Sequence, residues 1–480
     1  MSGVTVAAVG FLAMLVLIAV RMPVGLSMLV VGAAGYIHLS GLQPFLAYMK
    51  TNPYQQFSNY TLSVIPLFVL MGALAERGGI AGALFRSAES AFGRFRGGYA
   101  MAVIGACTAF GAICGSSVAT TATFGRAALP ELDKYGYDGG LSTGVIAVGG
   151  TLGILIPPSV ILVVYAITTE QNIAKLFQAA LIPGLLAALF YCIVIAVVAR
   201  RNPQLAPVAE RSQEPRRPKT LLPKLLAAAL LAAIAVQFAR GAVGLEHAAL
   251  MALVPVLIAF VDVAVMPAIL VAVIVVGGIY GGIFTPTEGA AVGAVAMLLI
   301  GLAQRKLSAG DILLAIRQTA ETSGMIFIIL LGAEVFGAFL ALSHLPTAAA
   351  ETIAGSGLSP HMVLVAMMVL YILLGAVMDE LAMILLTLPV FFPVVQGLDF
   401  GMPPDEVGIW FGILVLMVVG VGLVAPPIGL NVFVVSAIAK GVPIERTYRG
   451  VLPFVGADIV RIALVILFPG TALWLVRLLA

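Results

Sequence analysis

The sequence has 480 residues, of which 61% are hydrophobic and only 10% are charged, and its formal net charge is +3. A chain with so little polar surface cannot stay soluble as globular domains, so a lipid bilayer is the expected environment for most of its length. The small net charge, with no basic face interleaved with aromatic residues, argues against nucleic acid as a partner.

The N-terminal region, residues 1–61, is predicted to supply scaffold helices. Its first apolar run, 4–20, lacks a basic start and continues past Arg21 into a second run, 23–41. These features favour a spanning helix over a signal peptide. The three cysteines lie in apolar segments and are expected to pack as small core residues rather than form disulfides or bind metal: Cys107, Cys114 and Cys192.

Residues 62–200 are predicted to contain a helical hairpin followed by a broken helix. The apolar segments 99–114 and 117–130 are each too short to cross a bilayer alone. They fit better as a hairpin that turns at Gly115 and enters and leaves the membrane on one face. Irregular backbone at such depth is tolerated only where protein or a wet cavity covers it.

A polar linker divides the chain. The stretch 200–224 carries seven basic and two acidic residues, which predicts a cytoplasmic location under the positive-inside rule. The rest of 201–264 is predicted to form two additional helices. An even number of predicted crossings leads from this linker to the next basic loop, Arg305-Lys306, which also places that loop in the cytoplasm. Arg21 in a cytoplasmic loop would put the N-terminus in the periplasm.

The second half is predicted to begin with connecting scaffold helices, 265–321, and to continue with a second hairpin and broken helix, 322–480. Glu288 follows Thr285 and Pro286 at the start of an apolar run. A threonine before the helix, a proline in its first turn and an acid near its positive end are typical of a helix start. We therefore expect Glu288 to cap a helix.

A repeat relates the two halves. The proline pair at 157–158 recurs at 426–427, and each pair is followed at nearly the same distance by another proline, Pro183 or Pro453. A Gly-Ala dipeptide precedes each pair at a comparable distance. Glycine and proline are common in membrane helices, so one match alone would mean little, but three in the same order indicate a repeat. The predicted topology gives the halves opposite orientations, as in secondary transporters.

Two oxygen-rich sites are expected where the hairpin tips face the proline breaks. Proline removes a backbone donor and blocks the preceding turn, so each break frees carbonyls that could ligate sodium. The first tip adds Ser116, Ser117 and Thr120, and the second adds Asp379 and Glu380. Helix packing is an alternative role for the serines. A solvated loop is an alternative setting for the acidic pair, although an acid within apolar sequence is by default a functional candidate.

Four segments resemble the DctM-type large membrane subunit of tripartite ATP-independent periplasmic (TRAP) transporters. They are Gly115-Ser-Ser-Val-Ala-Thr, Gly149-Gly-Thr-Leu-Gly-Ile-Leu-Ile-Pro-Pro-Ser, Gly281-Gly-Ile-Phe-Thr-Pro-Thr-Glu and Ala425-Pro-Pro-Ile-Gly-Leu-Asn. The resemblance implies an all-α polytopic membrane protein of elevator type, with inverted repeats, two re-entrant helical hairpins and two broken helices. It also implies the bacterial inner membrane, sodium as the coupling ion and no other cofactor. The implied partners are a small TRAP membrane subunit and a periplasmic binding protein that delivers a carboxylate, such as a dicarboxylate.

The resemblance also implies ligands, position by position. The first sodium would be bound by Ser116, Ser117, Gly150, Thr151 and Pro157. The second sodium would be bound by Asp379, Ala425, Pro426 and Gly429. The substrate would lie between the two tips, against Ser116, Thr120, Asp379 and Asn431.

Three other classes of protein remain open at this point. A sodium:anion symporter of similar fold would work without a binding protein. An intramembrane enzyme would need a catalytic constellation, yet the sequence has no His-Glu-x-x-His motif and its four histidines are scattered. A channel would need a continuous pore, whereas paired broken helices suit an occluded site better. A transporter, rather than an enzyme, is the expected function.

Overall fold

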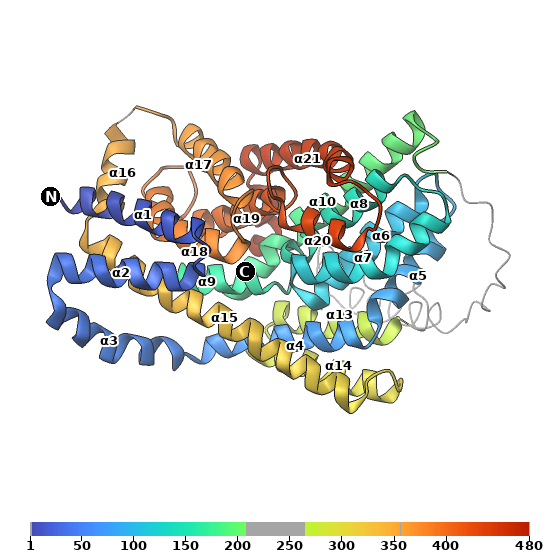
Figure 1. Cartoon of the computed structure of the whole chain (residues 1–480), viewed down its shortest axis with the longest axis horizontal. Coiled ribbons are helices and arrows are strands. Elements are labelled where there is room, and N and C mark those ends of the chain that lie inside the picture. Colours follow the sequence, from blue (N-terminus) through green and yellow to red (C-terminus); the bar gives the residue numbers. More distant parts are fainter. Residues whose placement is uncertain (1, 208–264, 356, 480) are drawn as a thin grey trace, which may run out of the picture.

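The computed structural model describes residues 2–207, 265–355 and 357–479, and every regular element in these ranges is helical (Figure 1). Six of the helices are long and apolar enough to cross a membrane, or seven spans if a bent pair is counted as one. Many of their leucine and valine side chains face outward, as expected of surfaces in contact with lipid. The prediction of an all-α polytopic membrane protein is confirmed. The two additional helices predicted within 201–264 fall almost entirely outside the described residues.

The six helices from Ile80 to Arg201 and the six from Leu345 to Leu467 follow one another with similar lengths. The first half contains α1 (Gly3–Ala19), α2 (Val24–Ser40), α3 (Leu42–Phe57), the short η1 (Tyr60–Ser63), α4 (Val64–Arg77), α5 (Ile80–Phe92), α6 (Gly98–Cys114), α7 (Ser117–Lys134), α8 (Gly139–Leu155), α9 (Val160–Thr168) and α10 (Ile173–Arg201). The second contains α13 (Met266–Tyr280), α14 (Pro286–Ala303), α15 (Ala309–Leu342), α16 (Leu345–Gly355), α17 (Pro360–Gly375), α18 (Glu380–Gln396), α19 (Pro404–Gly422), α20 (Leu430–Ile438), α21 (Ile444–Leu467) and α22 (Gly470–Leu478).

Three short helices, α3, α5 and α16, were not expected from the sequence. The first carries several polar residues and the other two are only 13 and 11 residues long. Such segments lack the long apolar run that marks a membrane helix. In Figure 1, α5 and α16 lie at opposite ends of the molecule and cross the general direction of the longer helices.

The start of α14 confirms the predicted helix cap. The Glu288 backbone N–H donates to the Thr285 hydroxyl at 3.3 Å, and the Thr285 N–H donates to Oε2 of Glu288 at 2.8 Å. Pro286 occupies the first helical position. This reciprocal pair of bonds gives partners to two backbone N–H groups that the helix end would otherwise leave unsatisfied.

The broken helices form the centre of the molecule. The bend between α8 and α9 is 44°, at the break predicted around the first proline pair. Every residue of α8 after Gly139 is buried, as is every residue of α19 from Val407 onward. The short helix α20 packs on α7 and α8, while α9 packs on α18 and α19. Each half therefore places its short helix against the hairpin and broken helix of the other half.

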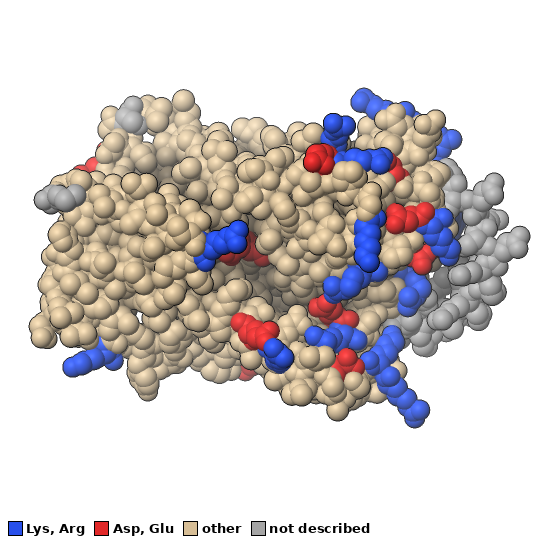
Figure 2. All heavy atoms as spheres, in the orientation of Figure 1, with Lys and Arg blue, Asp and Glu red and all other residues tan. Residues whose placement is uncertain are grey.

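Charged side chains gather at one end of the molecule. Figure 2 shows most of them on the visible face near α5 and the connection between α14 and α15. The N-terminus lies at the other end, where few charges are seen (Figure 1).

Cys107 and Cys114 are buried and Cys192 is partly buried, in keeping with the predicted packing of cysteines in apolar segments. All three are free thiols.

Candidate functional site

The first hairpin turns at a glycine and begins its second arm with a serine cap. Gly115 has φ +63°, in the left-handed region that glycine adopts without strain. Ser116 is the N-cap of α7, and its hydroxyl accepts the Ala119 N–H at 3.4 Å. The Thr120 hydroxyl donates to the Ser116 carbonyl at 2.7 Å. The tip thus concentrates oxygen atoms within one turn of helix.

Glycines allow this tip to lie directly on the first broken helix. A Cβ atom on Gly115 would be 2.7 Å from the Pro158 carbonyl oxygen. One on Gly153 would be 2.7 Å from the Ser116 carbonyl oxygen, and one on Gly150 would fall on the Thr121 hydroxyl. These distances are too short for a side chain at any of the three glycines. At Gly115 and Gly153 the contact is between backbone and backbone, and at Gly150 it is with the Thr121 side chain.

The structure therefore brings together most of the first predicted sodium site. Ser116, Ser117 and Gly150 lie at this contact, and Pro157 adjoins it. All ten residues 151–160, which include the break, are buried. A cation bound here would be shielded from bulk water on this side.

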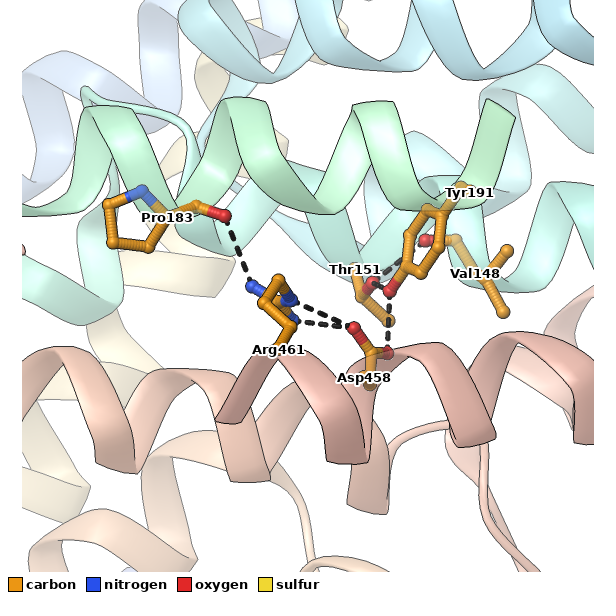
Figure 3. Close-up of polar contacts among 6 residues, drawn as sticks. All are labelled: Val148, Thr151, Pro183, Tyr191, Asp458 and Arg461. Carbon is orange, nitrogen blue, oxygen red and sulfur yellow. Dashed lines mark hydrogen bonds and ion pairs between the residues drawn. The ribbon is translucent and has the colours of Figure 1, made fainter. Parts of the chain in front are cut away.

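Thr151 departs from the rest of that set. Its hydroxyl donates to the Val148 carbonyl at 2.7 Å and lies 3.3 Å from the Tyr191 hydroxyl, on the side of α8 that faces α10 (Figure 3). Only the backbone of Thr151 is thus placed to contribute at the hairpin tip. Side-chain direction on a helix depends on the rotamer and the neighbouring helices, which the sequence alone did not reveal.

Asn431 ties the second broken helix to the first hairpin. It is fully buried in the first turns of α20, and its amide nitrogen donates to the Ser117 hydroxyl at 2.7 Å and to the Ala147 carbonyl at 3.0 Å. Its Oδ1 atom, like the Thr121 hydroxyl, is buried and has no hydrogen-bond partner within the described part of the chain. Buried polar atoms nearly always have a hydrogen-bond partner, so each of these two oxygens is expected to contact a ligand, an ion or a water molecule.

The second hairpin tip carries a carboxylate that caps a helix. Asp379 is the N-cap of α18, and its Oδ1 atom accepts the backbone N–H groups of Leu381 and Ala382, both at 3.1 Å. Its second oxygen, Oδ2, takes part in neither of these two bonds. A Cβ atom on Gly422 would be 2.7 Å from the Cα of Gly375, so this hairpin also lies against the broken helix of its own half.

The second break is more accessible than the first. Pro426, Pro427 and Ile428 are exposed, whereas Ala425 and Gly429 are buried. Gly429 has φ +55°, and a Cβ atom there would be 2.9 Å from the Ala425 carbonyl oxygen, so the backbone folds tightly over the freed carbonyls.

A tyrosine that the sequence reasoning missed covers this second break. The hydroxyl of Tyr448 lies 2.9 Å from the Pro427 carbonyl oxygen and 2.6 Å from that of Ile428. A single tyrosine proton serves two carbonyls, so one of them stays available for another donor or a cation. No local pattern marks Tyr448, which stands between two arginines at the start of α21.

A separate crevice of about 600 Å³ lies between α3 and α15 on one side and α9 and α18 on the other. Its walls include the polar side chains of Asn52, Gln56, Glu170 and Glu334. None of the predicted sodium or substrate residues lines it. The crevice lies beside the open end of the second hairpin rather than its tip.

Known proteins resemble this chain over most of its length. The family model described as "Tripartite ATP-independent periplasmic transporter, DctM component" matches residues 11–471. The chain is 33% identical over 421 residues to the C4-dicarboxylate TRAP transporter large permease protein DctM of Pseudomonas aeruginosa, which covers 88% of this chain and 87% of that protein. It is 30% identical over 447 residues to the isethionate TRAP transporter permease protein DctMQ of Oleidesulfovibrio alaskensis, over 93% of this chain and 62% of that protein.

A solved structure shares the fold. The crystal structure of the YdaH transporter of Alcanivorax borkumensis matches with a TM-score of 0.59 and 13% sequence identity, over 88% of each chain. At that identity the likeness concerns the arrangement of helices and not the chemistry of the site.

Proposed function

Because the chain belongs to the DctM component family of tripartite ATP-independent periplasmic transporters, we propose that it couples the uptake of a carboxylate to sodium. It is a large membrane subunit of such a transporter and not an enzyme. The family works with a small membrane subunit and a periplasmic binding protein. The specific proposal is that the binding protein delivers a dicarboxylate or a related organic acid to the space between the two hairpin tips.

The observation that carries the sodium proposal is a pair of buried oxygens beside the first hairpin that have no hydrogen-bond partner among the described residues. Asn431, whose amide nitrogen donates to the Ser117 hydroxyl, and Thr121, whose hydroxyl faces Gly150 of α8, both lie at the second arm of this hairpin. Hydroxyl, amide and carbonyl oxygens are the ligands that hard cations prefer. In this proposal the first ion is bound at Ser116, Ser117, Gly150, the Thr151 backbone and Pro157.

The second ion would be bound at the more accessible break, by Asp379, Ala425, Pro426 and Gly429. The carboxylate of Asp379 at the second tip supports this, since a carboxylate within a membrane protein is costly without a compensating charge. A cation at this position would also offset repulsion between Asp379 and an anionic substrate. The two relatives named above are described as permeases for C4-dicarboxylate and for isethionate, both anions.

The proposed substrate contacts lie on both sides of the contact between the halves. Ser116 and Thr120 stand at the first tip, Asp379 at the second, and Asn431 where α20 meets α7. A substrate that contacted all four residues would contact both hairpins, so its affinity would depend on the position of one hairpin relative to the other. This arrangement suits an occluded site better than an open pore.

We further propose that the two halves are inverted repeats that move as an elevator. The repeated order of helices, the opposite placement of α5 and α16 and the reciprocal packing of α9 and α20 support this arrangement. The charged end of the molecule would face the cytoplasm of the bacterial inner membrane. The basic sequence of the stretch 200–224 likewise favours the cytoplasm. The N-terminus would then face the periplasm.

The test is uptake into proteoliposomes that contain the small subunit, with the binding protein added outside and a labelled C4-dicarboxylate or isethionate as substrate. We expect an inward sodium gradient to drive uptake, and Ser116→Ala and Asp379→Asn to reduce it at least tenfold. Glu406→Gln is the matched control, because Glu406 pairs with Arg477 at an exposed site and should leave uptake unchanged. Wild-type uptake that ignores the sodium gradient would contradict the coupling. Uptake that needs no binding protein would instead indicate the independent symporter.

A further inference from the structure

An ion pair is buried where α21 meets α10. The side chains of Asp458 and Arg461 are only 2% and 3% exposed, and an oxygen and a nitrogen of the pair are 2.6 Å apart. Both residues lie well inside a helix that is long and apolar enough to cross the membrane. Burying two charges is expensive, and intramembrane ionisable residues are rare unless they have a role. The signal was visible in the sequence as two charges in an apolar run.

The pair is satisfied by groups from the first half of the chain (Figure 3). Two guanidinium nitrogens of Arg461 donate to Asp458 Oδ1, and the third donates to the Pro183 carbonyl of α10 at 3.2 Å. The Tyr191 hydroxyl, also on α10, donates to Asp458 Oδ2 at 2.7 Å. The network thus joins α10 to α21.

The same network reaches the first broken helix. Because the single Tyr191 proton goes to the carboxylate, the tyrosine oxygen is left as an acceptor. The Thr151 hydroxyl lies 3.3 Å from it and 2.7 Å from the Val148 carbonyl, so Thr151 can donate to either. Thr151 is between Gly150 and Gly153, which contact the hairpin tip on the opposite side of α8. This turn of α8 is therefore held from both sides.

We propose that Asp458 and Tyr191 are positioning residues that fix Thr151, and with it the turn 150–153 of α8, against the first hairpin tip. By holding this turn, they set the affinity of the first break for its cation without touching the ion. This inference rests on the proposed sodium coupling. The buried pair does more than join α10 to α21, because Tyr191, which donates to Asp458, also lies 3.3 Å from the Thr151 hydroxyl on the helix that carries the break.

Tyr191→Phe is the sharpest probe of this role. It removes one hydroxyl and keeps the ring, which packs edge-on against Phe454 with centroids 5.7 Å apart. Thr151→Val removes the hydroxyl at the other end of the contact and keeps the side-chain shape, while Thr151→Ser retains it. Thr319→Val is the control, since the one bond of the buried Thr319 hydroxyl within the described ranges goes to the Ala315 carbonyl of its own helix.

Two measurements distinguish a role in positioning Thr151 from a role in only anchoring the helices. The first is the sodium concentration that gives half-maximal uptake in proteoliposomes. The second is the rise in melting temperature when sodium replaces choline. We expect Tyr191→Phe and Thr151→Val each to raise the half-maximal sodium concentration at least threefold and to reduce the sodium-induced rise. In sodium dependence the double variant should match the single ones, because both substitutions remove the contact between Tyr191 and Thr151. Each substitution also removes a second hydrogen bond, to Asp458 or to the Val148 carbonyl, so the losses in melting temperature can differ. Thr151→Ser and Thr319→Val should behave as wild type, and the substrate KM at saturating sodium should be unchanged.

The outcomes separate this inference from the function on which it rests. A wild-type protein that responds to sodium, with Tyr191→Phe and Thr151→Val responding identically, overturns the positioning role and leaves the coupling intact. Variants that melt earlier but keep the wild-type sodium dependence show that the network only anchors helices, which also overturns it. A wild-type protein whose uptake and melting both ignore sodium overturns the coupling and this inference together.

Discussion

The amide nitrogen of Asn431 lies 2.7 Å from the Ser117 hydroxyl oxygen and 3.0 Å from the Ala147 carbonyl oxygen, so one side chain bridges three helices. Asn431 begins the short helix after the second break, while Ser117 begins the second arm of the first hairpin. The two predicted sites therefore share a structural element, and a change at one will be felt at the other.

Replacing Asn431 should weaken both stability and transport. In Asn431→Ala, two buried acceptors lose their donor, which should lower the free energy of unfolding by about 1–3 kcal/mol. Ser117→Ala removes one of these bonds and should have a smaller effect. The measurement is thermal denaturation of the purified protein in detergent, with uptake assayed in parallel. Because the two residues share a bond, their effects should not add, and strict additivity would show that the bond is energetically unimportant.

Gly115→Ala should abolish transport, whereas Gly79→Ala should be tolerated. Both glycines have positive φ, +63° and +68°, so alanine costs about 1–2 kcal/mol of backbone strain at either. A Cβ at position 79 meets nothing within 4 Å, but one at position 115 would be 2.7 Å from the Pro158 carbonyl oxygen. The comparison of uptake and melting temperature isolates the close contact. Equal effects of the two substitutions would mean that the hairpin tip does not rest on the break.

The contact between α7 and α8 offers a rescue experiment. Gly150→Ala places a methyl group on the Thr121 hydroxyl and 3.0 Å from the Ser117 carbonyl oxygen, and we expect a loss of stability of about 1–3 kcal/mol from overpacking. Thr121→Ala removes the hydroxyl and should restore part of that loss in the double variant. Melting temperatures of the four proteins in this cycle give the result. No rescue at all would show that the backbone carbonyl, not Thr121, sets the limit.

Breaking the buried ion pair should be far more harmful than breaking an exposed one. Asp458→Asn leaves the Arg461 guanidinium buried without its counter-charge, and such changes cost about 3–5 kcal/mol. Arg477→Gln breaks a pair with Glu406 of the same 2.6 Å length, but Arg477 is 53% exposed, so the loss should be below about 1 kcal/mol. Denaturation in detergent compares the two. Similar losses would indicate that water reaches the Asp458 site.

The sequence could predict the breaks and the hairpin turns because their causes are local. A proline pair interrupts a helix wherever it occurs, and Gly115 marks a turn through its own backbone freedom. The helix α3 could not be predicted in this way, because its polar residues interrupt the apolar run by which the other helices were recognised.

The partners of side chains could not be predicted, because they are set by packing between distant segments. Tyr191 and Asp458 are 267 positions apart, and neither carries a local sign of the other. For the same reason the sequence predicted Thr151 as a member of the ion site without indicating that its hydroxyl faces α10 instead. The proposed ion and substrate ligands themselves stay predictions until uptake is measured.

The unequal exposure of the two breaks bears on the order of events in a transport cycle. Residues 151–160 are buried throughout, while Pro426, Pro427 and Ile428 reach the surface. In this conformation an ion at the second break could exchange with the surroundings while one at the first stayed trapped. The two ions would then leave in sequence, the second first, and this order would follow from the unequal exposure of the two breaks.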